Sequence, residues 1–145
     1  MPFVKQLIQL TDDQKTEMLT VLQALKEVVT EAGEEWTYVR RPNATGLGTG
    51  CVYVHNGEPD CIAGRVLHKL GVSTADLSKW EGKVCGQMSS EHLTIQLDLP
   101  RIPFDEHSLG VLNVAQDSSD SGYSWGSSLE KARAHAREFY GVELS

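Results

Sequence analysis

The feature that most constrains the fold of this chain is a long stripe of apolar residues near its N-terminus. Between Thr11 and Gly33 these residues recur every three or four positions, which is the spacing of one helix face: Met18, Val21, Leu22, Leu25, Val28 and Val29. Thr11 and Gln14 match the capping box that opens a helix, and Gly33 is a residue type that ends one. The sequence therefore predicts a long helix whose apolar face the rest of the chain must cover.

Three later segments have the composition or alternation of strands, at residues 36–41, 50–55 and 93–99. The first two are expected to pair as antiparallel strands across a long loop. Residues that favour helix starts precede three further segments (Asp60, Ser73 and Ser124), and Phe104 with Asp105 begins another helix. The predicted fold class is α+β, a small antiparallel sheet of about three strands packed against the long N-terminal helix and the C-terminal helices. We expect a single compact domain over residues 1–145.

Composition and charge narrow the function classes. The chain has 145 residues, of which 40% are hydrophobic and 23% charged, values typical of a globular protein. It contains no apolar run long enough to span a membrane, and its first residues lack the pattern of a signal peptide. We therefore expect a cytoplasmic protein that does not bind membranes. The net charge of −7 disfavours direct nucleic-acid binding, which needs a basic face.

The segment Cys51–Leu70 concentrates the residues that are capable of thiol or metal chemistry. Cys61 is expected at a helix N-terminus, where the helix dipole favours a thiolate, and His55 ends the preceding strand. These two residues are the candidate catalytic pair, a nucleophile with a base. Neighbouring acidic residues oppose a thiolate, and buried structural thiols are the commoner outcome. A zinc site built from Cys51, His55, Cys61 and His68 is disfavoured by its spacing, and we expect no metal and no cofactor.

A glycine-rich loop, with an arginine pair before it, is the candidate ligand-binding segment. Its residues are Arg40, Arg41, Gly46, Gly48 and Gly50. A phosphate-binding loop normally leads directly into a helix, whereas a strand is expected to follow here. Loop flexibility between paired strands therefore explains the glycines without a ligand.

Two segments carry a resemblance to known proteins. The first runs from Tyr53-Val54 through Pro59-x-Cys61-Ile-Ala-Gly-Arg-Val-Leu67 to Leu70-Gly71-Val72. The second contains Ala115-Gln116, Asp120-x-Gly122-x-x-Trp125-Gly126 and Ala132. Together they resemble uncharacterised small proteins of actinobacteria and their phages. This chain departs from that pattern within Gln116-Asp-Ser-Ser-Asp120, where a serine replaces a second glutamine. No activity accompanies the resemblance, which implies an architectural role: Asp120 and Gly122 close one helix, and Trp125 and Gly126 open the next.

The sequence leaves two function classes open. The first is a small acidic accessory protein that binds a protein partner; a phage or prophage origin and a host factor as the target belong to this hypothesis. The alternative is a small-ligand binder or a thiol-dependent enzyme that uses the Gly46–Gly50 loop and the Cys51–Cys61 turn. Self-association through the apolar lead Phe3–Leu10 is a further possibility. The tryptophans Trp36, Trp80 and Trp125 are expected to anchor the core or an interface.

Overall fold

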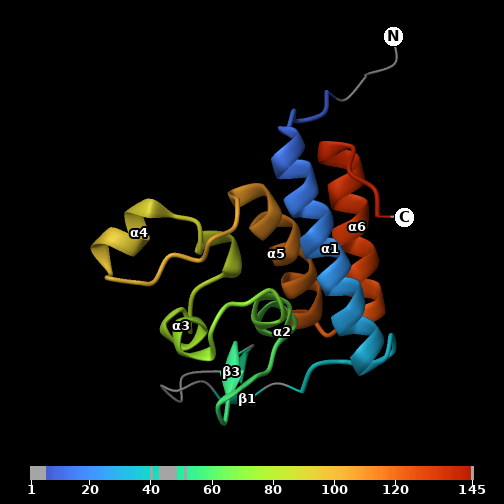
Figure 1. Cartoon of the computed structure of the whole chain (residues 1–145). Coiled ribbons are helices and arrows are strands. Elements are labelled where there is room, and N and C mark those ends of the chain that lie inside the picture. Colours follow the sequence, from blue (N-terminus) through green and yellow to red (C-terminus); the bar gives the residue numbers. More distant parts are fainter. Residues whose placement is uncertain (1–5, 40, 43–48, 51, 145) are drawn as a thin grey trace.

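A computed structural model describes residues 6–39, 41–42, 49–50 and 52–144. The described chain is mostly helical (Figure 1), in the order α1 (Asp12–Ala32), β1 (Arg41–Pro42), β2 (Thr49–Gly50), β3 (Val54–His55), β4 (Glu58–Pro59), α2 (Ile62–Lys69), α3 (Thr74–Lys79), η1 (Cys85–Gln87, a 3₁₀ turn), α4 (Glu91–Gln96), α5 (Glu106–Asp120) and α6 (Trp125–Tyr140). The α+β class is therefore confirmed only in a broad sense, because the β structure consists of two-residue strands.

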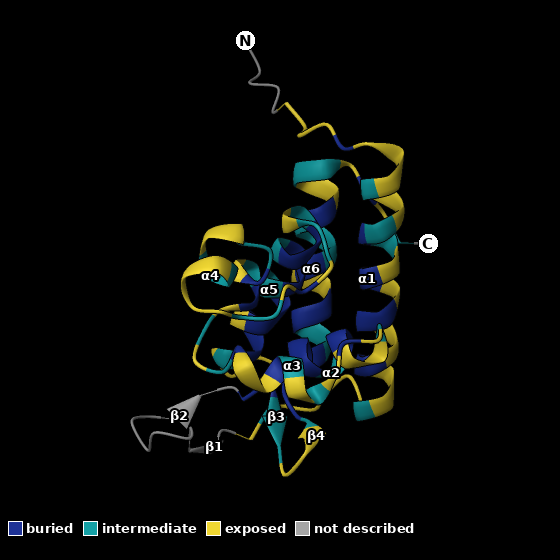
Figure 2. Ribbon diagram, turned by 60° about the vertical axis from the view of Figure 1, so that its left-hand side comes forward, coloured by how far each residue is buried: buried dark blue, intermediate teal, exposed yellow. Residues whose placement is uncertain are grey.

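Helix α1 forms as its sequence predicts. Thr11 accepts a hydrogen bond from the Gln14 N–H, and the Gln14 side chain accepts one from the Thr11 N–H, so the capping box is complete. Gly33 ends the helix with φ at 101°, a conformation that a residue without a Cβ adopts at little cost. The apolar stripe of α1 is buried and packs against α2, α5 and α6, so these four helices form the body of the molecule (Figures 1 and 2).

One hydrophobic cluster runs through the described structure, and all six α-helices except α4 contribute buried residues to it. Trp80 and Trp125 are completely buried in it, which confirms the prediction that they are core anchors. Each indole N–H has an acceptor: the Pro100 carbonyl at 2.7 Å and the Ser119 hydroxyl at 2.9 Å. Trp36 differs, since it is 40% exposed and contacts the Trp125 ring edge to face.

The strand predictions are only partly correct. β1 pairs with β2 in antiparallel register, Arg41 opposite Gly50, so the expected pairing is confirmed only at this position: residues 36–39 form no strand, and β3 pairs with β4 instead. β3 and β4 form a second antiparallel pair around Asn56 and Gly57, whose positive φ angles of 53° and 78° make a tight hairpin turn.

The third predicted strand, residues 93–99, is wrong: most of it lies in helix α4 and the turn that follows. Ser90 caps α4 by accepting a hydrogen bond from the Leu93 N–H. Asp98 then takes a left-handed conformation, with φ at 51°, and the Leu99 N–H donates to the Thr94 carbonyl. This is the closure of a Schellman motif, which satisfies the free carbonyls at a helix end. The alternating leucines and isoleucine therefore belong to a short capped helix and its stop.

The predicted starts of the remaining helices agree with the structure, whereas α5 continues to Asp120, through residues 117–120 that were expected in a break. Ser73 caps α3, Asp105 caps α5 and Ser124 caps α6 through their side-chain oxygens. The exception is Asp60, because Cys61 takes the N-cap position of α2 instead. Within the described residues, no helix combines the length and apolarity needed to cross a bilayer.

Candidate functional site

The candidate catalytic pair lies at the β3–β4 hairpin and the start of α2. Cys61 is the N-cap of α2, and its sulfur accepts a hydrogen bond from the Gly64 N–H at 3.3 Å. The side chain is completely buried. His55 is half-buried in the hairpin, with a ring nitrogen 3.3 Å from the Asn56 side-chain amide. Among the described residues no hydrogen bond joins the Cys61 sulfur to the His55 ring, so the structure gives the thiol a capping role.

A second cysteine lies close to the first in the core. Cys85 is completely buried, and its thiol donates to the Asn113 side-chain oxygen at 3.3 Å. Burial is the main reason why the pKa of Cys85 lies well above its usual value, and electrostatic interactions with Cys61, Asp117 and Asp120 raise it further. Cys85 is therefore a neutral thiol that packs the core, and both cysteines are free.

The other sequence candidates fall partly outside the described residues. Arg40, Gly46, Gly48 and Cys51 lie there, and for Arg41 and Gly50 only the backbone pairing of β1 with β2 is described. Within the described part of the chain no group of three or more histidine, cysteine or acidic side chains could hold a metal ion. The proposed ligand loop thus stays a prediction.

The two segments that carry the resemblance contact each other inside the protein. Gln116 of α5 is 95% buried, and its side-chain oxygen accepts a hydrogen bond from the Ala63 N–H at 3.0 Å. Ala63 is in the first turn of α2, where helix N–H groups have no partner within the helix. The Gln116 amide nitrogen donates to Asp120 at 2.8 Å. One glutamine therefore connects the start of α2 to the end of α5.

Two glycines of the same segments permit close backbone contacts. A Cβ atom on Gly64 would lie 2.4 Å from the Tyr53 carbonyl oxygen, and one on Gly126 would lie 2.7 Å from the Glu34 carbonyl oxygen. The Gly126 N–H donates to that same Glu34 carbonyl at 2.8 Å. The glycines thus fix the hairpin against α2 and the end of α1 against α6, which agrees with an architectural role for both segments.

Polar side chains bind the hairpin to the helical body. A Glu81 oxygen accepts hydrogen bonds from the Tyr53 and Val54 N–H groups, at 2.5 and 3.1 Å. Its partial burial raises the pKa of the Glu81 carboxyl, although the two N–H donors act in the opposite direction. The Tyr38 hydroxyl donates to the buried Asp60 carboxylate. These contacts give the hairpin a fixed position against the end of α3.

Helix α4 is the feature that sequence reasoning missed. It lies on an arm, residues 89–101, between the buried side chains of Met88 and Ile102, and it buries none of its own residues. Leu93 and Leu99 are half-buried and pack one side of the arm against the core, while the rest of the arm projects at the edge of the helical body (Figure 1). Ile95 is 75% exposed and Leu97 is 50% exposed. The sequence signal was available in the Ser90 cap, but the alternation of apolar residues indicated a half-buried strand.

Comparisons with known proteins found no relative of this chain. No family model matches the chain, and no curated protein or solved structure matches it.

Proposed function

We propose that this chain is a non-enzymatic accessory protein of the cytoplasm that binds a protein partner through the α4 arm. The observation that supports it is the exposure of Ile95 in α4 and of Leu97 at its C-cap. The core does not require these two side chains: Leu93 of α4 is only half-buried against it, and α4 has no buried residue of its own. A fold gains no stability by keeping large aliphatic side chains in water, whereas an interface gains from covering them.

The arm has enough apolar surface to matter for binding. Covering a branched aliphatic side chain is worth about 1.5–3 kcal/mol, so covering both exposed side chains contributes on the order of 3 kcal/mol. That free energy corresponds to roughly a hundredfold in affinity. Two exposed apolar side chains on one short arm are compatible with the usual organisation of an interface, in which a few residues supply most of the binding energy.

The shape and charge of the arm indicate the kind of partner. A projecting helix inserts into a concave surface, so the partner offers an apolar cleft. Glu91 and Asp98 flank the apolar residues, which favours basic residues at the rim of that cleft. A second copy of this chain fits less well because both copies would carry a net charge of −7. The resemblance to proteins of actinobacteria and their phages makes a host protein the first partner to seek.

A pull-down with matched variants tests the proposal. The wild-type chain, a variant with Ile95→Ser and Leu97→Ser, and a control variant Val39→Ser are used as bait in an actinobacterial lysate. Val39 is 60% exposed and lies outside the arm. We expect a protein retained in stoichiometric amount by the wild type and the control, and lost by the double variant. Purified, that protein should bind the wild type at least about tenfold more tightly than the double variant.

Two results would refute the proposal. One is the absence of any protein that distinguishes the wild type from the arm variant. The other is a partner that a photo-cross-linking residue placed at position 95 fails to reach. Urea denaturation of all three baits controls for folding, since exposed positions should change the stability by less than about 0.5 kcal/mol.

A further inference from the structure

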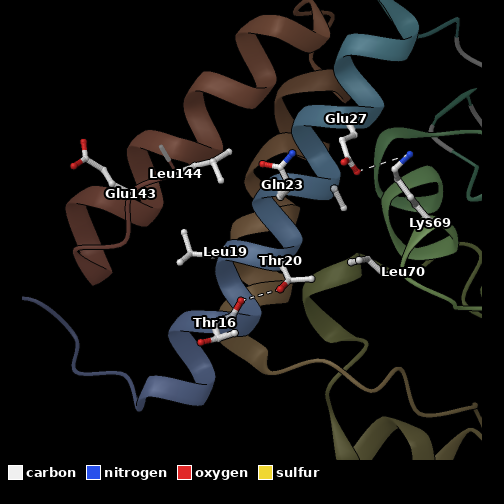
Figure 3. Close-up of a pocket in the computed structure, with 10 residues that line it drawn as sticks. Thr16, Leu19, Thr20, Gln23, Glu27, Lys69, Leu70, Glu143 and Leu144 are labelled. Carbon is white, nitrogen blue, oxygen red and sulfur yellow. Dashed lines mark hydrogen bonds and ion pairs between the residues drawn. The ribbon is translucent and has the colours of Figure 1, made fainter.

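A shallow groove of about 630 Å³ crosses the exposed face of α1 (Figure 3). Thr16, Thr20, Gln23 and Glu27 recur along that face at three- or four-residue spacing and form the middle of the groove. The C-terminal segment supplies one wall and the end of α2 supplies the other. From the helical rise, the groove extends about 16 Å between Thr16 and Glu27.

Three leucine side chains contribute apolar surface to the lining of the groove. Leu19, Leu70 and Leu144 come from three different elements, are half-buried, and pack against the core while still facing the groove. Thr20 adds little polarity because its hydroxyl donates to the Thr16 carbonyl within the helix, at 3.0 Å. The groove thus combines aliphatic walls with a helical surface on which the Thr20 hydroxyl donor is already used.

The charged side chains at the groove are mostly acidic, and the cations are already paired. The Lys69 ammonium lies 2.6 Å from a Glu31 oxygen and 3.9 Å from a Glu27 oxygen. Glu143, on the opposite wall, is 71% exposed at its side chain and lies 3.9 Å from an Arg137 nitrogen. Carboxylates therefore outnumber cations around the groove, on a chain whose total charge is −7.

We infer that this groove is a second binding site, which holds one face of a cationic amphipathic helix from a protein partner. Its length matches about three turns of helix, and its three leucines offer contacts to apolar anchors at i, i+3 or i+4 and i+7. Lysine or arginine residues beside those anchors meet Glu27 and Glu143. This inference is independent of the α4 arm. The arm presents exposed apolar side chains to a partner, whereas the groove receives apolar side chains from a partner.

Two model peptides and two matched variants test the inference. The probes are fluorescent leucine–lysine and leucine–glutamate amphipathic peptides of about 18 residues, or five turns of helix. Thr20→Trp fills the groove, while Thr30→Trp is the control: both threonines are exposed on α1 and donate to the carbonyl four residues earlier. Thr30 is not among the groove residues. Fluorescence anisotropy of each peptide with the full chain gives the affinity.

We expect saturable binding of the leucine–lysine peptide, weakened about tenfold by Thr20→Trp and unchanged by Thr30→Trp. The leucine–glutamate peptide should not bind, and Glu143→Lys should weaken binding of the basic peptide. Equal affinity of the two tryptophan variants would overturn the inference, because it would show general attraction to an acidic surface. Binding of both peptides alike would overturn the charge argument. Self-association that only Thr20→Trp abolishes would assign the groove to a second copy instead.

Discussion

Replacing Gln116 by leucine tests whether the two resembling segments hold the fold together. The substitution keeps the approximate size of the side chain but removes both of its hydrogen bonds. The Ala63 N–H is then left in a fully buried position without an acceptor, which costs about 1–3 kcal/mol. Loss of the donor to Asp120 adds about 1 kcal/mol, because that carboxylate is half-exposed and water replaces part of the bond. We expect a total loss of about 2–4 kcal/mol in the free energy of unfolding.

Urea denaturation followed by circular dichroism measures this loss, with an unchanged m-value as the sign that the folded state is intact. For a chain of this length the same loss lowers Tm by about 6–12 °C. Gln87→Leu is the control, because Gln87 is exposed and should change the stability by less than about 0.5 kcal/mol. If Gln116→Leu were as mild as this control, the glutamine would not be the connection between α2 and α5, and the structural reading of the motif would be wrong.

Three further predictions concern glycine, pH and thiols. Gly64→Ala should destabilise the protein by about 1–3 kcal/mol, because its Cβ meets a backbone oxygen, whereas Gly110→Ala, with open space in α5, should stabilise it by about 0.5–1 kcal/mol; urea midpoints that rank the other way would contradict the packing. The pKa of Glu81 is higher in the folded protein than in the unfolded chain, so the folded state binds this proton more tightly. The resulting stabilisation is complete at pH values below the unfolded pKa, and it is lost as the pH rises through the folded pKa. Glu81→Gln should therefore gain stability relative to the wild type between about pH 4 and 7, as melting curves across that range would show; a constant difference would refute the raised pKa. Cys61 and Cys85 should resist alkylation in the native protein and react after denaturation; mass spectrometry of modified peptides checks this, and rapid native labelling would contradict their burial.

The helices of the body could be predicted because local signals and the global fold agree. In α1 the capping box, the apolar spacing and the terminal glycine all specify the same element, and the stripe is buried as expected. Ser73, Asp105 and Ser124 are capping residues that act within the chain segment they begin. Such signals need no information about distant residues, which is why a single sequence reveals them.

The α4 arm was not predictable in the same way. Residues 93–99 alternate between apolar and polar side chains, and that pattern indicates a strand when one face is buried against a sheet. Here no sheet is present beside the arm in the described structure, and the two most apolar exposed positions, Ile95 and Leu97, face solvent. The alternation does not reveal whether a partner strand exists. Without a partner strand, the helix cap at Ser90 and the left-handed conformation of Asp98 determine the local structure.

The candidate site was likewise predictable only in part from the sequence. The position of Cys61 at a helix start followed from the sequence, but its complete burial comes from tertiary packing, in which Gln116 of the distant α5 bonds the neighbouring Ala63 N–H. The groove on α1 likewise depends on where the C-terminal segment returns, which spacing within one helix cannot reveal. Sequence patterns locate the elements, whereas the surfaces between distant elements require the structure.

The attachment of the arm at Met88 and Ile102 has a consequence for how this protein can diverge. Both anchors belong to the interior, while the positions between them that face outward support no other helix. Substitutions at these exposed positions change the stability of the body very little. The residues that contact a partner can therefore change one at a time while the protein stays folded. A lineage that must follow a changing target gains from separating its scaffold from its variable tip in this manner.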